Sequence, residues 1–141
     1  MTGKSVLILS DHSKSTPIWV DAFLQRGLDA TSISSPEEAY RRWREDLPML
    51  TVVDLSLPFD DCLEVCRRLL DIAHVPILLI LSTAGTDEII QVYRAGVTEC
   101  LIQPASPAVI LLKALAWSMR SDFTLAEPMH EWHRTESLAS F

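Results

Sequence analysis

Short apolar runs alternate along the chain with segments in which apolar residues recur at helical spacing. This alternation is typical of strand–helix units built around a parallel sheet. The expected strands are the five runs at residues 6–9, 29–33, 49–53, 75–81 and 99–102. Because the connections are short and crossovers between parallel strands are right-handed, the pattern favours an open, doubly wound α/β sheet. The run at 75–81 is the most apolar and is expected to be a central strand, whereas the half-polar run at 29–33 is expected near an edge.

Capping residues mark where the expected helices begin. Ser35 precedes Pro36, and Glu38 lies where it can reach back to complete a capping box. Asp61 and Glu64 fit a second capping box at the start of the next helix. The apolar side of the helix that begins at Ser35 is expected to comprise Ala39, Tyr40, Trp43 and Leu47. The buried stripe of the helix that begins at Asp61 is expected to comprise Cys62, Cys66, Leu69 and Ala73.

Glycine and proline indicate further helix boundaries. Gly27 and Gly96 can each adopt the left-handed conformation that commonly ends a helix. Ser106 followed by Pro107 is expected to open a last helix that runs to about Arg120.

The length of 141 residues suits one domain. The segment that follows the last expected helix is more polar and contains a proline. We therefore predict a domain of residues 1–120 and a C-terminal tail of residues 121–141. Within this tail Leu125, Met129 and Trp132 fall at helical spacing, so it is expected to be able to form a short helix.

Charge and composition then narrow the function classes. The net charge of −7 argues against a nucleic-acid binder, whose affinity depends on clustered Lys and Arg. The longest apolar stretch is far below the roughly 20 residues that a membrane-spanning helix needs, and no signal-peptide pattern opens the chain. The three cysteines form no Cys-x-x-Cys pair, which is typical of free thiols. We expect a cytoplasmic protein that binds neither nucleic acid nor membrane.

Acidic and polar residues stand where the expected strands end. In an open α/β sheet, sites lie outside the carboxyl ends of the strands. With the strand order 2-1-3-4-5, Asp11 and Asp54 come from neighbouring strand ends and should lie close together. Two adjacent carboxylates repel each other, and a hard cation such as Mg²⁺ makes their pairing favourable. Ser82 and Gln103 follow the fourth and fifth strands and should join the same rim.

Three segments resemble the receiver domains of bacterial response regulators in two-component signalling. They are VLILSDH at residues 6–12, TVVDLSLPFDDCLEVCRRLL at residues 51–70 and VPILLILSTAGTDEIIQVYRAGVTECLIQPAS at residues 75–106. The resemblance covers roughly residues 5–120, with all five strand ends in order. It implies a flavodoxin-like (βα)5 sandwich, a doubly wound parallel five-stranded sheet with strand order 2-1-3-4-5.

The resemblance assigns roles to several residues. Asp54 matches the phosphoacceptor of the family, which takes a phosphoryl group from a histidine kinase or a small acyl phosphate. The Mg²⁺ ligands of the family match Asp11, Asp54 and the backbone carbonyl of Ser56. A hydroxyl that binds a phosphoryl oxygen matches Ser82, or Thr83 if the register is one residue later.

The family's lysine in the last loop is replaced by Gln103, while the following Pro104 is retained, so the bond between them is expected to be cis. Three other positions also depart from the family pattern. Ser10 replaces the first of two acidic residues, so Mg²⁺ should bind more weakly than is typical. Cys100 replaces the aromatic switch residue, and Cys62 replaces a glycine at the start of the third helix. These changes put the usual relay of the signal in doubt.

The resemblance implies a signalling module that is not an enzyme and acts through protein contacts. Its expected partners are a histidine kinase or phosphotransfer protein and a downstream protein. Homodimerisation is an expectation from the family alone. The alternative is a pseudo-receiver that binds its partner without phosphorylation, which Ser10, Gln103 and Cys100 favour.

Three further residue patterns suggest other chemistry. The hydroxyls of Ser10, Ser13, Ser15 and Thr16 could form a phosphate loop for FMN, but Asp11 would repel the phosphate. Cys62 and Cys66 lie one helical turn apart and could bind a soft metal, although small buried apolar groups are the simpler interpretation. His130 and His133 do not have zinc-protease spacing.

Overall fold

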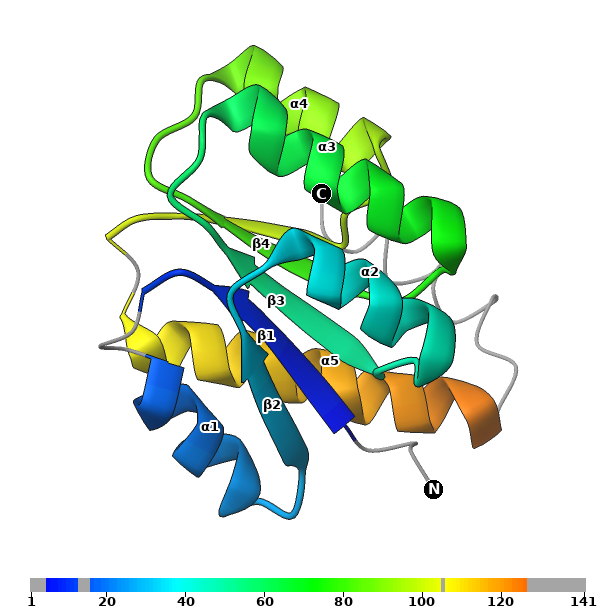
Figure 1. The fold of residues 1–141 in the computed structure, drawn as a ribbon. Helices are drawn as coiled ribbons and strands as arrows, with labels where there is room; N and C mark the ends of the chain where they lie inside the picture. The colour runs from blue at the N-terminus through cyan, green and yellow to red at the C-terminus, as the bar shows by residue number, and fades with distance from the viewer. Residues whose placement is uncertain (1–4, 13–15, 105, 127–141) are drawn as a thin grey trace.

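The fold is a five-stranded parallel sheet covered by helices on both faces (Figure 1). It is seen in a computed structural model that describes residues 5–12, 16–104 and 106–126. The strands are β1 (Ser5–Ser10), β2 (Asp29–Ile33), β3 (Leu50–Asp54), β4 (Ile77–Leu81) and β5 (Glu99–Ile102). Their order is β2-β1-β3-β4-β5, and every neighbouring pair is parallel. The predicted doubly wound fold and strand order are therefore confirmed.

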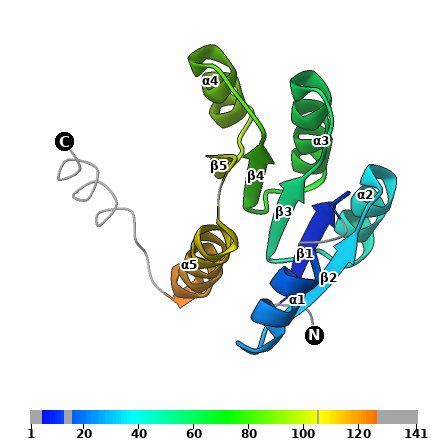
Figure 2. The same ribbon diagram turned by 90° about the vertical axis from the view of Figure 1, so that its left-hand side faces the viewer.

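The helices divide between the two faces of the sheet. They are α1 (Thr16–Leu24), α2 (Pro36–Glu45), α3 (Phe59–Ile72), α4 (Thr86–Arg94) and α5 (Pro107–Ala126). Figure 2 shows α1 and α5 on one face and α2, α3 and α4 on the other. Within the described part of the chain, no helix is both long enough and apolar enough to cross a membrane.

Alternation along each strand builds one apolar layer on each face of the sheet. In β4, Leu79 packs in the layer under α2, α3 and α4, whereas Leu78 and Ile80 pack in the layer under α1 and α5. Successive side chains of a strand point to opposite faces, so a strand buried on both sides is apolar throughout. All five residues of β4 are buried, as expected of a central strand.

The helix boundaries confirm some capping predictions and correct others. The Ser35 hydroxyl accepts the backbone N–H of Glu38 at 3.4 Å, which confirms the N-cap of α2. Gly27 and Gly96 have φ values of 81° and 103°, which confirms their left-handed conformation. The capping box predicted at Asp61 is wrong, because α3 begins at Phe59 with Pro58 at its N-cap. The carbonyl of Pro58 accepts the backbone N–H groups of Asp61 and Cys62, and no side chain caps this helix.

Two further expectations differ from the structure. Leu47 lies beyond the end of α2 and is exposed, so it does not belong to the apolar side of that helix. The last helix extends to Ala126, six residues past the expected end near Arg120. Met129 and Trp132 of the expected short tail helix lie outside the described residues, as do His130 and His133.

Candidate functional site

Asp54 is the centre of the candidate site. It is the last residue of β3 and pairs in register with Ser10, the last residue of β1. Because these strands are adjacent and parallel, the residues that follow them leave the sheet at the same edge. Asp54 is only 5% exposed, which is unusual for a carboxylate. The sequence-based pairing of Asp11 with Asp54 at this edge therefore agrees with the structure.

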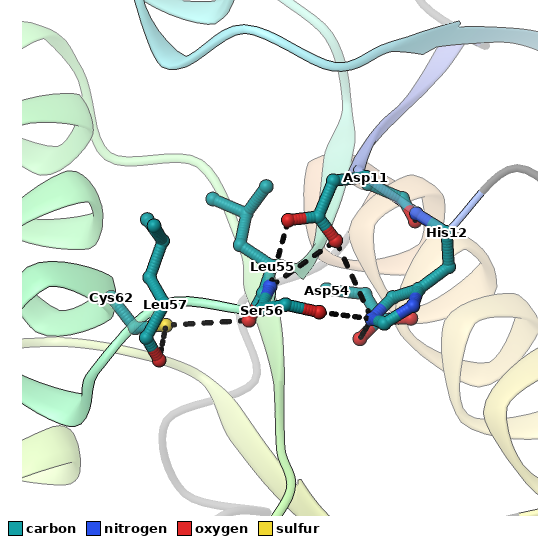
Figure 3. A network of polar contacts seen from close by, with 8 residues as sticks. Asp11, His12, Asp54, Leu55, Ser56, Leu57 and Cys62 are labelled. Atoms are coloured by element: carbon teal, nitrogen blue, oxygen red, sulfur yellow. Dashed lines mark hydrogen bonds and ion pairs between the residues drawn. The ribbon is translucent and has the colours of Figure 1, made fainter.

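The loops after β1 and β3 are joined by hydrogen bonds (Figure 3). The carboxylate of Asp11 accepts the backbone N–H of Ser56 at 2.9 Å through Oδ2 and at 3.2 Å through Oδ1. This contact holds the segment after Asp54 against the loop that carries Asp11. It also places the backbone N–H of Ser56 against the carboxylate of Asp11.

His12 is a residue of the site that the sequence-based assignment missed. Its Nε2 lies 3.5 Å from Oδ1 of Asp11, 3.4 Å from Oδ1 of Asp54 and 3.2 Å from the hydroxyl of Ser56. Figure 3 shows the imidazole lying between the two carboxylates. The family pattern gives this position no role among the phosphoryl or metal ligands. The sequence therefore pointed to His12 only through its position directly after Asp11.

Burial raises the pKa of the Asp54 carboxyl above its ordinary value. The nearby imidazole of His12 opposes this shift, and the negative charge of Asp11 adds to it. A raised pKa means that the charged form is less favourable here than in water. A cation beside Asp54 would relieve this cost, so the electrostatics favour a positively charged ligand.

The residues predicted to contact a phosphoryl group line one cavity of about 440 Å³ in front of Asp54. They are Ser82, Thr83 and Gln103, from the loops after β4 and β5. The backbone N–H of Gln103 donates to the carbonyl of Leu81 at 2.8 Å, which fixes the last loop against β4. The Gln103–Pro104 bond is cis, as predicted. The structure thus brings Ser82, Thr83 and Gln103 to the same cavity as Asp54.

The thiol of Cys62 contacts the loop between β3 and α3. Its Sγ donates to the carbonyls of Leu55 at 3.6 Å and Leu57 at 3.5 Å (Figure 3). Burial raises its pKa, and burial raises the pKa of the Cys66 thiol to about 12. Both thiols therefore stay protonated near neutral pH and are buried in the apolar layer, as expected of small hydrophobic groups.

The donor set fits a hard divalent cation better than a soft one. Asp11 and Asp54 supply carboxylate oxygens, and Ser56 supplies a backbone carbonyl. Mg²⁺ prefers oxygen ligands and commonly uses one or two carboxylates with several waters. Among residues 5–12, 16–104 and 106–126, no group of three or more His, Cys, Asp or Glu side chains is arranged to hold a metal ion. The cysteines therefore form no soft-metal site within this range.

Comparison with known proteins gives a consistent result. A family model described as the response regulator receiver domain matches residues 6–115. The DNA-binding response regulator MtrA of Mycobacterium tuberculosis is 25% identical over 122 residues, which cover 86% of this chain and 54% of that protein. The transcriptional regulatory protein YclJ of Bacillus subtilis is 22% identical over 111 residues, or 79% of this chain and 49% of that protein. The chain thus spans about half the length of these relatives.

Solved structures share the fold. A CheY-like receiver domain protein from Methanospirillum hungatei superposes with a TM-score of 0.75 at 15% identity, covering 86% of this chain and 98% of that chain. At this level of identity the likeness concerns the fold alone. It agrees with the strand order and with the division of the helices between the two faces of the sheet.

Proposed function

The chain belongs to the response regulator receiver family, and on that premise we propose that it accepts a phosphoryl group on the side chain of Asp54. The observation that carries the proposal is the placement of this carboxylate. It is buried at the end of β3, lies near Asp11 with the imidazole of His12 in contact range of both, and lines a cavity together with Ser82, Thr83 and Gln103. The donor would be a histidine kinase, a phosphotransfer protein or a small acyl phosphate.

The transfer is a substitution at phosphorus. A carboxylate oxygen of Asp54 forms the new P–O bond while the bond between phosphorus and the donor breaks. The donor group, an imidazole nitrogen or an acyl oxygen, leaves with the electron pair of that bond. The protein contributes by holding Asp54 in place and by stabilising the charge that develops on the phosphoryl oxygens.

Asp11, Asp54 and the carbonyl of Ser56 would hold the Mg²⁺ that receiver domains generally bind at their phosphorylation site. Bound there, Mg²⁺ would neutralise charge on the carboxylates and on the incoming phosphoryl group. Ser10 supplies a neutral hydroxyl where the family pattern has a carboxylate, and this hydroxyl accepts the backbone N–H of His12 at 3.0 Å. We therefore expect weaker Mg²⁺ binding than in receivers with two acidic residues at these positions.

Ser82, Thr83 and Gln103 would face the phosphoryl oxygens across the cavity. Their hydroxyl and amide groups donate neutral hydrogen bonds. A lysine in place of Gln103 would donate a charge-assisted bond, which is roughly twice as strong. The phosphorylated state should therefore be less stabilised than in family members that retain the lysine.

Signal output would depend on a change in protein contacts. The elements α4, β5 and α5 each carry exposed apolar side chains; they are Ile90, Tyr93, Ile102, Val109 and Leu112. We assign this surface to a downstream protein partner or to a second copy of the chain. A phosphoryl group adds about −1.5 to −2 charges and would shift the balance between two arrangements of these elements. The net charge of −7 favours a protein over a nucleic acid as the partner of this chain.

Tyr93 is also linked to the position where the family has an aromatic switch residue. Its hydroxyl accepts the backbone N–H of Cys100 at 3.0 Å. A relay from the site to this surface would therefore run through a tyrosine on α4 rather than through a side chain on β5.

The division of the chain into residues 1–120 and a tail of residues 121–141 also remains a prediction.

Intact mass after incubation with MgCl₂ and acetyl phosphate tests the proposal, with Asp54→Asn as the matched variant. We expect one added phosphoryl group in the parent protein and none in the variant. An adduct on both proteins would place the acceptor elsewhere. If neither protein gains mass and beryllofluoride also fails to bind, the proposal is wrong and the chain acts as a binding module without phosphorylation.

A further inference from the structure

His12 stands between the two carboxylates that would hold the cation. Its Nε2 is 3.4 Å from Oδ1 of Asp54 and 3.5 Å from Oδ1 of Asp11 (Figure 3). The same nitrogen lies 3.2 Å from the hydroxyl of Ser56, whose backbone carbonyl is the third proposed ligand. One side-chain nitrogen therefore borders all three residues of the proposed Mg²⁺ site.

A bound ion needs the space that this imidazole borders. Mg²⁺ lies about 2.0–2.1 Å from its oxygen ligands and usually keeps several waters. An ion held by Asp11 and Asp54 would therefore need room for itself and its waters beside these carboxylates. The ring of His12 and a hydrated ion would compete for this room and for the same carboxylate oxygens.

The imidazole is better suited to compete with the ion than to coordinate it. Mg²⁺ strongly prefers oxygen donors, whereas imidazole suits metals such as zinc or nickel. No set of three His, Cys, Asp or Glu side chains in the described ranges is arranged around a metal position. Nε2 of His12 instead lies within 3.5 Å of an oxygen of each carboxylate.

We infer that His12 occupies the place of the cation between Asp11 and Asp54, so that Mg²⁺ binds only when the imidazole moves out. The side chain of His12 is 39% exposed, and it borders the cavity of about 440 Å³. Its backbone N–H donates to the hydroxyl of Ser10 at 3.0 Å. The backbone can therefore keep its place while the ring rotates away. The inference rests on the proposed function, because it presupposes that the two carboxylates take a cation.

Calorimetric titration with MgCl₂ tests this inference on the full chain. The variants are His12→Ala and, as a matched control, His74→Ala, which changes an exposed histidine in the loop between α3 and β4. We expect His12→Ala to bind Mg²⁺ about tenfold more tightly, as when the binding-competent arrangement is about a tenth of the population. His74→Ala should match the parent protein.

A kinetic readout separates competition from a structural effect. With acetyl phosphate as donor, His12→Ala should reach half of its maximal phosphorylation rate at a lower MgCl₂ concentration, while the rate at saturating MgCl₂ changes little. Circular dichroism of each variant shows whether the fold is retained.

Each outcome has a distinct meaning. An unchanged Mg²⁺ affinity in His12→Ala would overturn the inference and leave the proposed function intact. A weaker affinity would also overturn it and would identify His12 as a ligand. If neither the parent protein nor His12→Ala binds Mg²⁺, the cation site of the proposed function is itself wrong.

Discussion

The interior of the sheet and its carboxyl edge are built from the same strands, but the interior buries apolar side chains whereas the edge buries a carboxylate. Within β3 and β4 all residues are buried, and alternating side chains fill the apolar layers on the two faces. At the edge, β3 ends in the buried carboxylate of Asp54, beside a second carboxylate from Asp11. The interior contributes the stability of the fold, whereas the edge keeps a charge that the fold alone stabilises poorly. Such local conflict is expected at functional sites.

Buried polar groups sharpen this contrast. Thr51 lies in β3, three residues before Asp54, and is fully buried. Its hydroxyl accepts the indole N–H of Trp43 at 3.0 Å, so the polar atoms of both side chains are paired inside the protein. Asp54 has an acidic neighbour and one imidazole instead. The same strand therefore carries a satisfied polar group in the interior and an incompletely compensated one at the edge.

The largest change in the free energy of unfolding is expected from a substitution that leaves a cavity in the interior. Leu79 of β4 is fully buried in the layer under α2, α3 and α4. Leu79→Ala should lower the free energy of unfolding by about 2–5 kcal/mol, because it removes buried methyl groups and leaves a void. Urea denaturation measures this change. The control is Leu112→Ala on α5, where the side chain is 66% exposed and the change should stay within about 0.5 kcal/mol. Equal losses in the two variants would contradict the assignment of stability to the interior.

A smaller loss is expected when the buried hydrogen bond is removed. Thr51→Val keeps the shape of the side chain but leaves the indole N–H of Trp43 without an acceptor. The free energy of unfolding should fall by about 1–3 kcal/mol, the usual cost of a buried unsatisfied donor. The same substitution at Thr31, which is partly exposed on the edge strand β2, is the control and should have little effect. A neutral Thr51→Val variant would show that this bond contributes nothing measurable.

The same contrast explains what the sequence could and could not predict. The strands and helices follow from periodicity, which depends on many residues at once, and the strand order follows from the resemblance to receiver domains. With that order, the geometry of parallel strands brings Asp11 and Asp54 to the same edge. The role of His12 depends on the direction of one side chain in a loop, and no periodic pattern encodes it. The start of α3 was missed because this helix has no side-chain cap: Asp61 lies inside it, and its backbone N–H donates to the carbonyl of Pro58.

The smallest change in the free energy of unfolding is expected at the carboxyl edge of the sheet, where a substitution should stabilise the protein instead of destabilising it. Burial raises the pKa of Asp54 in the folded state, so between the ordinary carboxyl range and this higher value the folded state binds more protons than the unfolded state. The parent protein should therefore lose stability as the pH rises through that window. Asp54→Asn removes this charge. Without divalent cations, it should be more stable than the parent at pH 7 by roughly 0.5–2 kcal/mol.

The difference in the free energy of unfolding between Asp54→Asn and the parent protein should depend on pH if it comes from the buried charge, but not if it comes from packing. The advantage of Asp54→Asn should disappear in acid, where the carboxyl of the parent protein is neutral as well. Urea denaturation at several pH values in the presence of EDTA measures it, with Asp29→Asn at the exposed start of β2 as the control. Added MgCl₂ should stabilise the parent more than Asp54→Asn, because the ion binds the folded state through this carboxylate. An advantage that persists unchanged in acid would mean that the Asp54 charge is already compensated, and the edge would then resemble the interior.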